Sequence, residues 1–375
     1  MVDSAVFIAY FVMALPAGFL IKKYGYKAGI LTGLLLFAVG SYLFVPSANT
    51  QSYAFFLVAL FVIACGLTIL ETAANPYASL LGSPEKATQR LNLAQSFNGL
   101  AATLAPIIGA EIILTEGYSD EALKVMEPAA REFALAAEAS SVKTPYIVLG
   151  SVILLVAIIF YFMKLPEIKE NANEEGSSSV FHAFRHKHLS WAVAAQFFYV
   201  GAQVCVFSFL ILYATKASGL SQLEAAKYAG GGAGLAFMLG RFIGTFFMRY
   251  VQPVKLLAIY SLMCASLSLL AMFATGLIAI YIIIGISFFM SIMFPTIFSL
   301  GIKNLGADTK FGSSLIIMSI VGGAILPPLF AFIADTYQNI QLGYIVPFVC
   351  FVVVLVFGLR GYKVQEKEKS VTILA

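Results

Sequence analysis

Residues 53–81 read YAFFLVALFVIACGLTILETAANPYASLL, an almost entirely apolar run that holds one carboxylate, Glu71. About 20 mainly apolar residues suffice to cross a bilayer as a helix, so this stretch predicts a membrane-spanning helix with an acid inside it. A charged side chain at that depth costs roughly 2.5–3.5 kcal/mol on insertion scales and usually faces a bundle interior or a wet cavity. Since an acid is an unfavourable way to make a plain helix contact, we interpret Glu71 as a functional residue.

The rest of the chain has the composition of a membrane protein. Hydrophobic residues make up 60% of it and charged residues 11%, with a mean hydropathy of +0.91, whereas soluble domains carry about 25% charged residues. The apolar runs lack the period-2 alternation of a lipid-facing barrel, so we predict an all-α membrane protein. Eleven spanning helices are expected, near residues 4–21, 28–46, 53–81, 91–114, 144–163, 189–214, 222–250, 255–274, 277–300, 309–332 and 340–359.

The basic residues orient these helices. When the helices are joined alternately across the membrane, 18 of the 23 lysines and arginines fall on one side. Cytoplasmic loops carry such an excess, so we place that side and the C-terminus in the cytoplasm, with the 115–143 loop and the first residue outside. An outside N-terminus on an odd number of helices leads us to expect that one helix is missing before residue 4. The net charge of +4 belongs to these loops, and we expect no nucleic-acid partner.

The chain contains two halves that repeat each other. Two short patterns occur at the predicted cytoplasmic ends of helices in both halves. In the first, a glycine stands five residues before a basic residue followed by tyrosine, and the pattern recurs after 226 residues. In the second, a proline stands six residues before a glycine, and the pattern recurs after 219 residues. The first is Gly18 with Lys23-Tyr24 and Gly244 with Arg249-Tyr250; the second is Pro76 with Gly82 and Pro295 with Gly301. Internal repeats mark secondary transporters, whose halves rock around a site near the midplane.

The longest hydrophilic cytoplasmic segment separates five predicted helices from six. We therefore expect an N-terminal bundle at 1–163, a cytoplasmic linker at 164–188, a C-terminal bundle at 189–362 and a tail at 363–375.

Polar side chains inside the spans are the candidates for binding. Glu71 and Asn75 are four residues apart and share a helix face, and Gln95 and Asn98 should point the same way in the next span. A third group, Gln196, Tyr199 and Gln203, forms a stripe on the first helix of the second half. Amides, a phenol and an acid can hydrogen-bond a polyhydroxylated molecule. Amides in spans also hold helices together, at about 0.6 kcal/mol each, and for any one amide we weigh the two roles equally.

Other ionisable residues are interpreted as structural. Arg241 is expected near a cytoplasmic helix end, where its side chain reaches the interface or fixes a loop, and Glu111 is expected at the outer interface. His182 and His186 could bind a metal at their spacing of four, but a solvated basic segment at 181–188 is favoured, and no metal site is predicted. The four cysteines, Cys65, Cys205, Cys264 and Cys350, lack pairing or zinc spacing and are interpreted as packing residues.

The sequence favours no enzyme and no cofactor. It has no G-x-S-x-G, no H-E-x-x-H and no Walker A loop for ATP. The energy source must then be an ion or substrate gradient.

Four segments resemble the fucose–proton symporter branch of the major facilitator superfamily. They are LETAANPY at 70–77, RLNLAQSFN at 90–98, AQFFYVGAQ at 195–203 and FPTIFSLGIKNLG at 294–306. The resemblance runs from about residue 4 to about residue 360. It implies the superfamily fold, two pseudo-symmetric six-helix bundles, of which this chain carries five helices plus six.

The resemblance also implies roles for residues. Glu71 matches a carboxylate implicated in sugar recognition and proton coupling, and Gln95 and Asn98 match amides at the sugar cavity. Glucose/galactose relatives tend to have Gln where Glu71 stands, which favours fucose. The family's first helix, with an Asp that takes part in coupling, has no counterpart here, and Asp3 is not that residue. Lys22 stands where the superfamily's loop pattern prefers an acid.

The expected function is therefore proton-coupled uptake of L-fucose or a related monosaccharide by a monomer in the inner (cytoplasmic) membrane of the cell. The alternatives are a glucose/galactose symporter or uniporter, a sugar-binding or truncated protein without transport, and an intramembrane enzyme.

Overall fold

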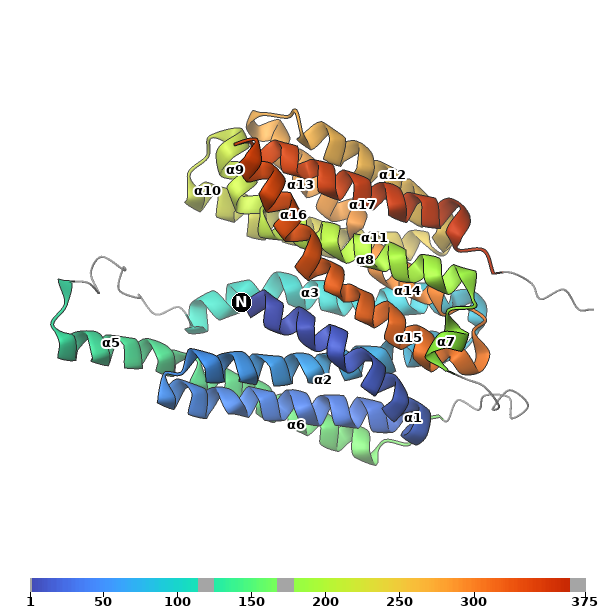
Figure 1. Ribbon diagram of the computed structural model, residues 1–375, viewed down its shortest axis with the longest axis horizontal. Coiled ribbons are helices and arrows are strands. Elements are labelled where there is room, and N and C mark those ends of the chain that lie inside the picture. Colours follow the sequence, from blue (N-terminus) through green and yellow to red (C-terminus); the bar gives the residue numbers. More distant parts are fainter. Residues whose placement is uncertain (1, 114–124, 167–178, 365–375) are drawn as a thin grey trace, which may run out of the picture.

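The computed structural model describes residues 2–113, 125–166 and 179–364, and these residues form helices and no strand. The helices pack as two bundles, one of α1 to α6 and the other of α8 to α17 (Figure 1). The all-helical fold with two bundles is the one expected from the sequence. The part of the linker at 167–178 and the tail from residue 365 lie outside the described residues, so the exact domain limits stay a prediction.

The first two predicted spans form one bent helix, α1 (Val2–Thr50). Its 49 residues would extend about 74 Å at 1.5 Å per residue, more than twice the hydrocarbon thickness. The bend is at Gly25, whose φ of 83° and ψ of 172° are not helical. Glycine adopts such angles without the strain that a Cβ would cause, so Gly25 turns the chain back between two crossings.

The rest of the N-terminal bundle follows the prediction except in the outer loop. The loop expected at 115–143 contains an additional helix, α5, which extends away from the bundle in Figure 1. Proline at its first position favours a helix start, and alanine-rich sequence continues it. The elements are α2 (Tyr53–Leu80), η1 (Pro84–Lys86), α3 (Ala87–Ile113), α5 (Pro128–Ser141) and α6 (Lys143–Phe162).

The C-terminal bundle contains more breaks than the sequence predicted. The span expected at 222–250 is two α-helices joined by a π-helical turn at 228–234, where four of seven residues are glycine. The span expected at 309–332 has a 3-10 turn at 319–321 before two glycines. The elements are α7 (Val180–Ala183), α8 (Lys187–Ser208), α9 (Leu210–Ser218), α10 (Gln222–Lys227), η3 (Tyr228–Gly234), α11 (Leu235–Phe247), α12 (Pro253–Ala271), α13 (Gly276–Met290), α14 (Met293–Gly301), η4 (Gly306–Asp308), α15 (Thr309–Met318), η5 (Ser319–Val321), α16 (Gly322–Thr336), η6 (Ile340–Tyr344), α17 (Ile345–Val356) and η7 (Phe357–Gly361).

Every predicted span coincides with helix. In the described part of the chain, eight helical segments are long and apolar enough to cross a membrane, and the first of them, 5–50, holds both arms of α1. The two other predicted crossings are α3 and the broken segment from α10 to α11, which are less apolar or interrupted. All four cysteines are buried and free, as their interpretation as packing residues requires.

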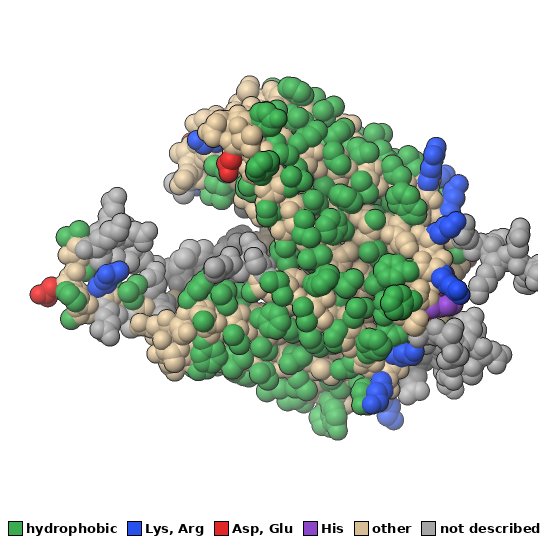
Figure 2. All heavy atoms as spheres, in the orientation of Figure 1, with side chains coloured by type: hydrophobic (Ala, Val, Ile, Leu, Met, Phe, Trp, Pro, Cys, Tyr) green, Lys and Arg blue, Asp and Glu red, His purple; other side chains and the backbone are tan. Residues whose placement is uncertain are grey.

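The two bundles meet along two seams. The first arm of α1 packs against α15, and α3 packs against α11 and α14. Most lysines and arginines in view lie at one end of the molecule, and at the opposite end the surface is hollowed between the bundles (Figure 2). The protein is therefore closed at its basic end.

Glycines let α1 and α2 approach closely inside the N-terminal bundle. A Cβ added at Gly66 would lie 2.5 Å from the backbone nitrogen of Phe37 and 2.7 Å from the carbonyl oxygen of Gly33. Small residues allow this approach between membrane helices, where van der Waals packing replaces the hydrophobic effect as the driving force. The contact makes α1 and α2 a rigid pair.

We expect Gly66→Ala to destabilise the N-terminal bundle, because the added methyl group meets backbone that cannot turn aside. Overpacking costs about 1–3 kcal/mol, so the midpoint of thermal unfolding in detergent should fall clearly. Gly231→Ala is the matched control, since a Cβ there would meet nothing within 4 Å. Equal midpoints for the two variants would contradict the packing argument.

Candidate substrate site

The carboxylate of Glu71 has a phenol as its partner. Tyr10 on the first arm of α1 donates a hydrogen bond from Oη to Oε1 of Glu71 on α2, at 3.1 Å. Within the described residues, no lysine or arginine nitrogen lies within 4.0 Å of this carboxylate. A membrane acid usually pairs with another charged group or faces water, and here a neutral hydroxyl leaves its charge free to respond to a proton or a ligand.

An amide pair lies one helical turn from Glu71. Gln95 on α3 donates from Nε2 to Oδ1 of Asn75 on α2, at 2.9 Å. Asn75 is buried, and its own Nδ2 has no hydrogen-bond partner in the part of the chain that the structure describes. Glu71 and Asn75 share a face of α2, and Gln95 contacts Asn75 from α3, a pairing that the sequence did not predict.

Arg241 joins this group from the other bundle. Its side chain was expected to reach the interface or fix a loop, and this is wrong, because Arg241 is buried at 3% exposure. Its Nη1 donates to the carbonyl of Gln95 at 2.7 Å and approaches Oδ1 of Asn98 at 3.5 Å, and its Nε donates to the carbonyl of Ser291 at 2.8 Å. The guanidinium also stacks over Phe237, 4.6 Å from the ring centre. Arg241 therefore ties α3 to the C-terminal bundle.

The stripe on α8 contains buried polar atoms without a hydrogen-bond partner among the residues that the structure describes. Gln196 and Tyr199 are fully buried, and the atoms concerned are both amide atoms of Gln196 and the hydroxyl of Tyr199. The Tyr199 hydroxyl lies near the Arg241 guanidinium, whereas Gln203 is half-buried, one turn further along α8. Each unsatisfied buried group costs about 1–3 kcal/mol. Among the described residues, no hydrogen bond joins these three side chains to Glu71 or Asn75.

The comparisons with known proteins decide the family. A sequence profile of the Major Facilitator Superfamily matches residues 1–316. The chain belongs to the major facilitator superfamily. Its members are transporters and not enzymes, so this is a multi-pass membrane transporter.

Two curated relatives cover nearly the whole chain. The L-fucose-proton symporter of Escherichia coli (strain K12) is 42% identical over 366 residues, which are 96% of this chain and 83% of that protein. The glucose/galactose transporter of Brucella abortus biovar 1 (strain 9-941) is 40% identical over 368 residues, or 97% and 85%. A crystal structure of the superfamily transporter FucP in the outward conformation matches with a TM-score of 0.90 at 41% identity, covering 98% of this chain and 89% of that one. The resemblance inferred from the sequence motifs is confirmed.

The transporter is sealed at its basic end by hydrogen bonds between the bundles. Thr88 and Ser299 share a hydrogen bond of 2.9 Å, Asn92 donates to Oγ1 of Thr296 at 3.1 Å, and Ser313 donates to the carbonyl of Thr72 at 3.0 Å. All of these residues are buried. Together with the hollow at the other end, these contacts show a molecule that is closed on one side and open on the opposite side (Figure 2).

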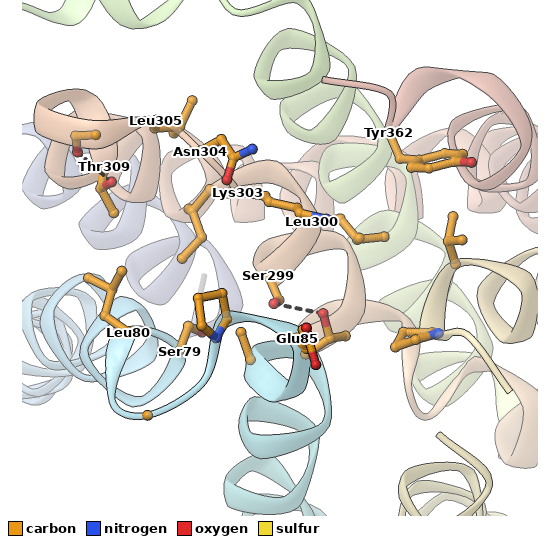
Figure 3. A pocket seen from close by; sticks show the side chains of 18 of the residues that line it. Ser79, Leu80, Glu85, Ser299, Leu300, Lys303, Asn304, Leu305, Thr309 and Tyr362 are labelled. Atoms are coloured by element: carbon orange, nitrogen blue, oxygen red, sulfur yellow. Dashed lines mark hydrogen bonds between the residues drawn. The ribbon is translucent and has the colours of Figure 1, made fainter. Parts of the chain in front are cut away.

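A cavity of about 650 Å³ lies at the basic end, with the hydrogen-bonded Thr88 and Ser299 among its lining residues. Ser79, Lys303 and Asn304 are among its lining residues (Figure 3). It contains none of the predicted binding residues, so it is separate from the Glu71 group.

The histidine segment is more structured than expected. His182 and His186 both hydrogen-bond to the buried carboxylate of Asp308, and His188 is buried and bonds to the carbonyl of Lys303. A freely solvated segment is therefore the wrong interpretation, because these imidazoles anchor it to the C-terminal bundle. The side chain of Glu111, expected at the outer interface, lies outside the described part of the structure.

Sequence reasoning missed Tyr10 and misplaced Arg241. Tyr10 sits in an apolar run with nothing that links it to a helix 61 residues away. The spacing of Arg241 could have indicated its burial. It precedes Arg249-Tyr250, the pair at the predicted membrane boundary, by eight residues, which place it about 12 Å deeper along the helix.

We expect Arg241→Met to open the basic end of the molecule, because it removes the bonds between the guanidinium and the carbonyls of Gln95 and Ser291. Spin labels on Lys86→Cys and Lys303→Cys, both exposed, should show a longer distance between the bundles. The four native cysteines are buried, which favours selective labelling. Arg249→Met, at an exposed arginine on the same side, is the control. An unchanged distance in the Arg241→Met protein would mean that the seal does not depend on this residue.

Proposed function

We propose that this protein takes up L-fucose together with a proton by alternating access, in the bacterial inner membrane and with its C-terminus in the cytoplasm. The observation that carries the proposal is the Glu71 carboxylate, held inside the N-terminal bundle by the Tyr10 phenol and lying one turn from the Asn75–Gln95 pair. Similarity to a protein named as an L-fucose-proton symporter supports it.

These residues have the chemistry to bind a sugar. Each hydroxyl of a monosaccharide can donate and accept, a carboxylate accepts, and an amide does both. Glu71 and the free Nδ2 of Asn75 supply an acceptor and a donor on one bundle, and Asn98 reaches toward Arg241 between the bundles. In this proposal, Gln196, Tyr199 and Gln203 complete the site from α8 once the sugar draws the bundles together.

Proton coupling is assigned to the same carboxylate. When Glu71 is charged, moving it into a closed, dry interior is costly, so the bundles rearrange readily only after it binds a proton outside. Release of the proton and the sugar inside restores the charge. The fully loaded and the empty states then interconvert, while half-loaded states do so poorly, and a differential affinity of this kind is what couples two ligands.

The second candidate substrate is glucose or galactose, because a glucose/galactose transporter is nearly as similar as the fucose symporter. A carboxylate at residue 71 favours fucose by the family resemblance. Monomeric transport and the sugar's identity are both part of the proposal.

The direct test is uptake of labelled L-fucose into transporter-deficient cells, with and without an imposed inward proton gradient. Gradient-driven uptake that unlabelled fucose blocks, and galactose or glucose does not, supports fucose–proton symport. If unlabelled galactose or glucose blocks the uptake, the substrate is assigned as glucose or galactose. Sugar binding without flux identifies a sugar-binding protein that does not transport.

We expect Glu71→Gln to lower proton-driven fucose uptake at least about tenfold, since hydrogen bonds to a charged group contribute about 1.5–3 kcal/mol. The residual uptake should no longer depend on external pH, because the glutamine cannot take up the proton. Uptake is measured as an initial rate between acidic and alkaline pH.

Two variants control this experiment. Tyr10→Phe removes the partner but keeps the carboxylate, so uptake should remain pH-dependent with an altered KM. Glu127→Gln changes an exposed acid at the start of α5 and should behave as wild type. Wild-type rates and pH dependence after Glu71→Gln would remove Glu71 from the mechanism.

A further inference from the structure

A second group of titratable side chains lies at the cytoplasmic surface, away from the proposed substrate site. Nδ1 of His182 lies 2.6 Å, and Nε2 of His186 3.1 Å, from the same carboxylate oxygen, Oδ2 of Asp308. The histidines come from the last part of the linker, and Asp308 ends the short turn η4 between α14 and α15. Residues more than 120 positions apart in the chain thus converge on one point.

We propose that His182, His186 and Asp308 form a binding site for a first-row divalent transition-metal ion, with Zn²⁺ as the reference ion. One donor atom from each residue lies within 4.8 Å of the other two. In a tetrahedral zinc site with bonds of about 2.0–2.1 Å, the ligand atoms are about 3.3 Å apart. Small rotations of the two imidazoles would therefore convert the hydrogen-bonded cluster into a coordination shell.

The donor set selects the class of ion. Two imidazole nitrogens and a carboxylate oxygen are typical of zinc sites that keep a fourth position for water, and imidazole suits zinc, copper, nickel or iron far better than magnesium or calcium. The fourth position has access to solvent, because the side chains of His182 and His186 are 33% and 25% exposed. The third histidine, His188, is turned to the carbonyl of Lys303 and is not a ligand.

The carboxylate provides an independent indication that a cation belongs here. The side chain of Asp308 is only 5% exposed, and its second oxygen, Oδ1, is buried without a hydrogen-bond partner among the described residues. Both imidazoles contact Oδ2 of Asp308, so Oδ1 is left without a hydrogen bond in the described part of the chain. Burying a carboxylate oxygen without a hydrogen bond or a cation costs free energy. A bound divalent ion would compensate the whole carboxylate.

The backbone already holds the ligands in place. The side chain of Ser179 accepts a hydrogen bond from the backbone nitrogen of His182, which starts the α7 turn, and His186 occupies the N-cap position of α8. A metal at this point would fasten the end of the linker to the loop between α14 and α15. The site is independent of which sugar is carried.

The experiment uses the full-length protein, purified in detergent through a tag without histidine and stripped with EDTA. Co²⁺ is titrated in, and the visible d–d absorption of four-coordinate Co²⁺ reports binding. The proposal predicts one bound equivalent, its displacement by Zn²⁺ but not by Mg²⁺, and a higher thermal midpoint with Zn²⁺ because the ion binds the folded state.

Two substitutions separate a metal site from a hydrogen-bonded contact. His186→Gln keeps a donor for Asp308 but removes a ligand, and it should weaken binding by more than about 100-fold, since even outer-shell partners are worth about 10–100-fold. His188→Gln removes the remaining histidine and should bind as wild type. Asp308→Asn, which keeps shape and loses charge, should also lose the bound ion. Circular dichroism and fucose uptake confirm that each variant is folded.

The proposal is overturned if the wild-type protein binds no equivalent of Co²⁺, or if His186→Gln binds as tightly as wild type. It is also overturned if His188→Gln and Asp308→Asn have equal effects.

Discussion

Inside a bilayer, a polar group without a protein hydrogen-bond partner has no water to replace it. The whole structure depends on this constraint. The backbone meets it by forming helices. The side chains meet it in pairs, as Tyr10 with Glu71 and Asn75 with Gln95. Arg241 meets it by donating to carbonyl groups of two other helices. Each of these contacts links helices that lie far apart in sequence, so the need to satisfy polar groups also positions the candidate site.

The contacts within a bundle differ in kind from those between bundles. Inside the N-terminal bundle, Gly33 and Gly66 bring two helix backbones into direct contact, and a side chain cannot be inserted there. Between the bundles, the seal at the basic end consists of single hydrogen bonds such as Thr88–Ser299 and Asn92–Thr296. Bonds of this type average about 0.6 kcal/mol in membrane proteins. Rigid bundles joined by weak, separable contacts are what rocking around a central site requires.

The same contrast holds at the cytoplasmic surface. The linker joins the two bundles, yet its last residues are fastened to the C-terminal bundle through His182 and His186 on Asp308. An anchor that gains strength from a metal ion would leave the candidate substrate site untouched, because His182, His186 and Asp308 are separate from the Glu71 group.

The sequence by itself determined the fold class and the family, since these depend on local properties. Apolar run length sets the helices, loop charge sets their orientation, and the depth of Glu71 marks it without any structure. Interruptions such as the π-helical turn at 228–234 escaped, because an apolar pattern does not register how a glycine run bends a helix.

Only the tertiary structure decided which groups meet. Nothing in the sequence pairs Tyr10 with Glu71, buries Arg241 between the bundles, or directs two linker histidines to Asp308, 126 and 122 residues away. These contacts depend on how helices cross and on the small rotations that bring one face against another. A single sequence carries no local signal for such long-range geometry, because each side chain is compatible with many partners until packing selects one.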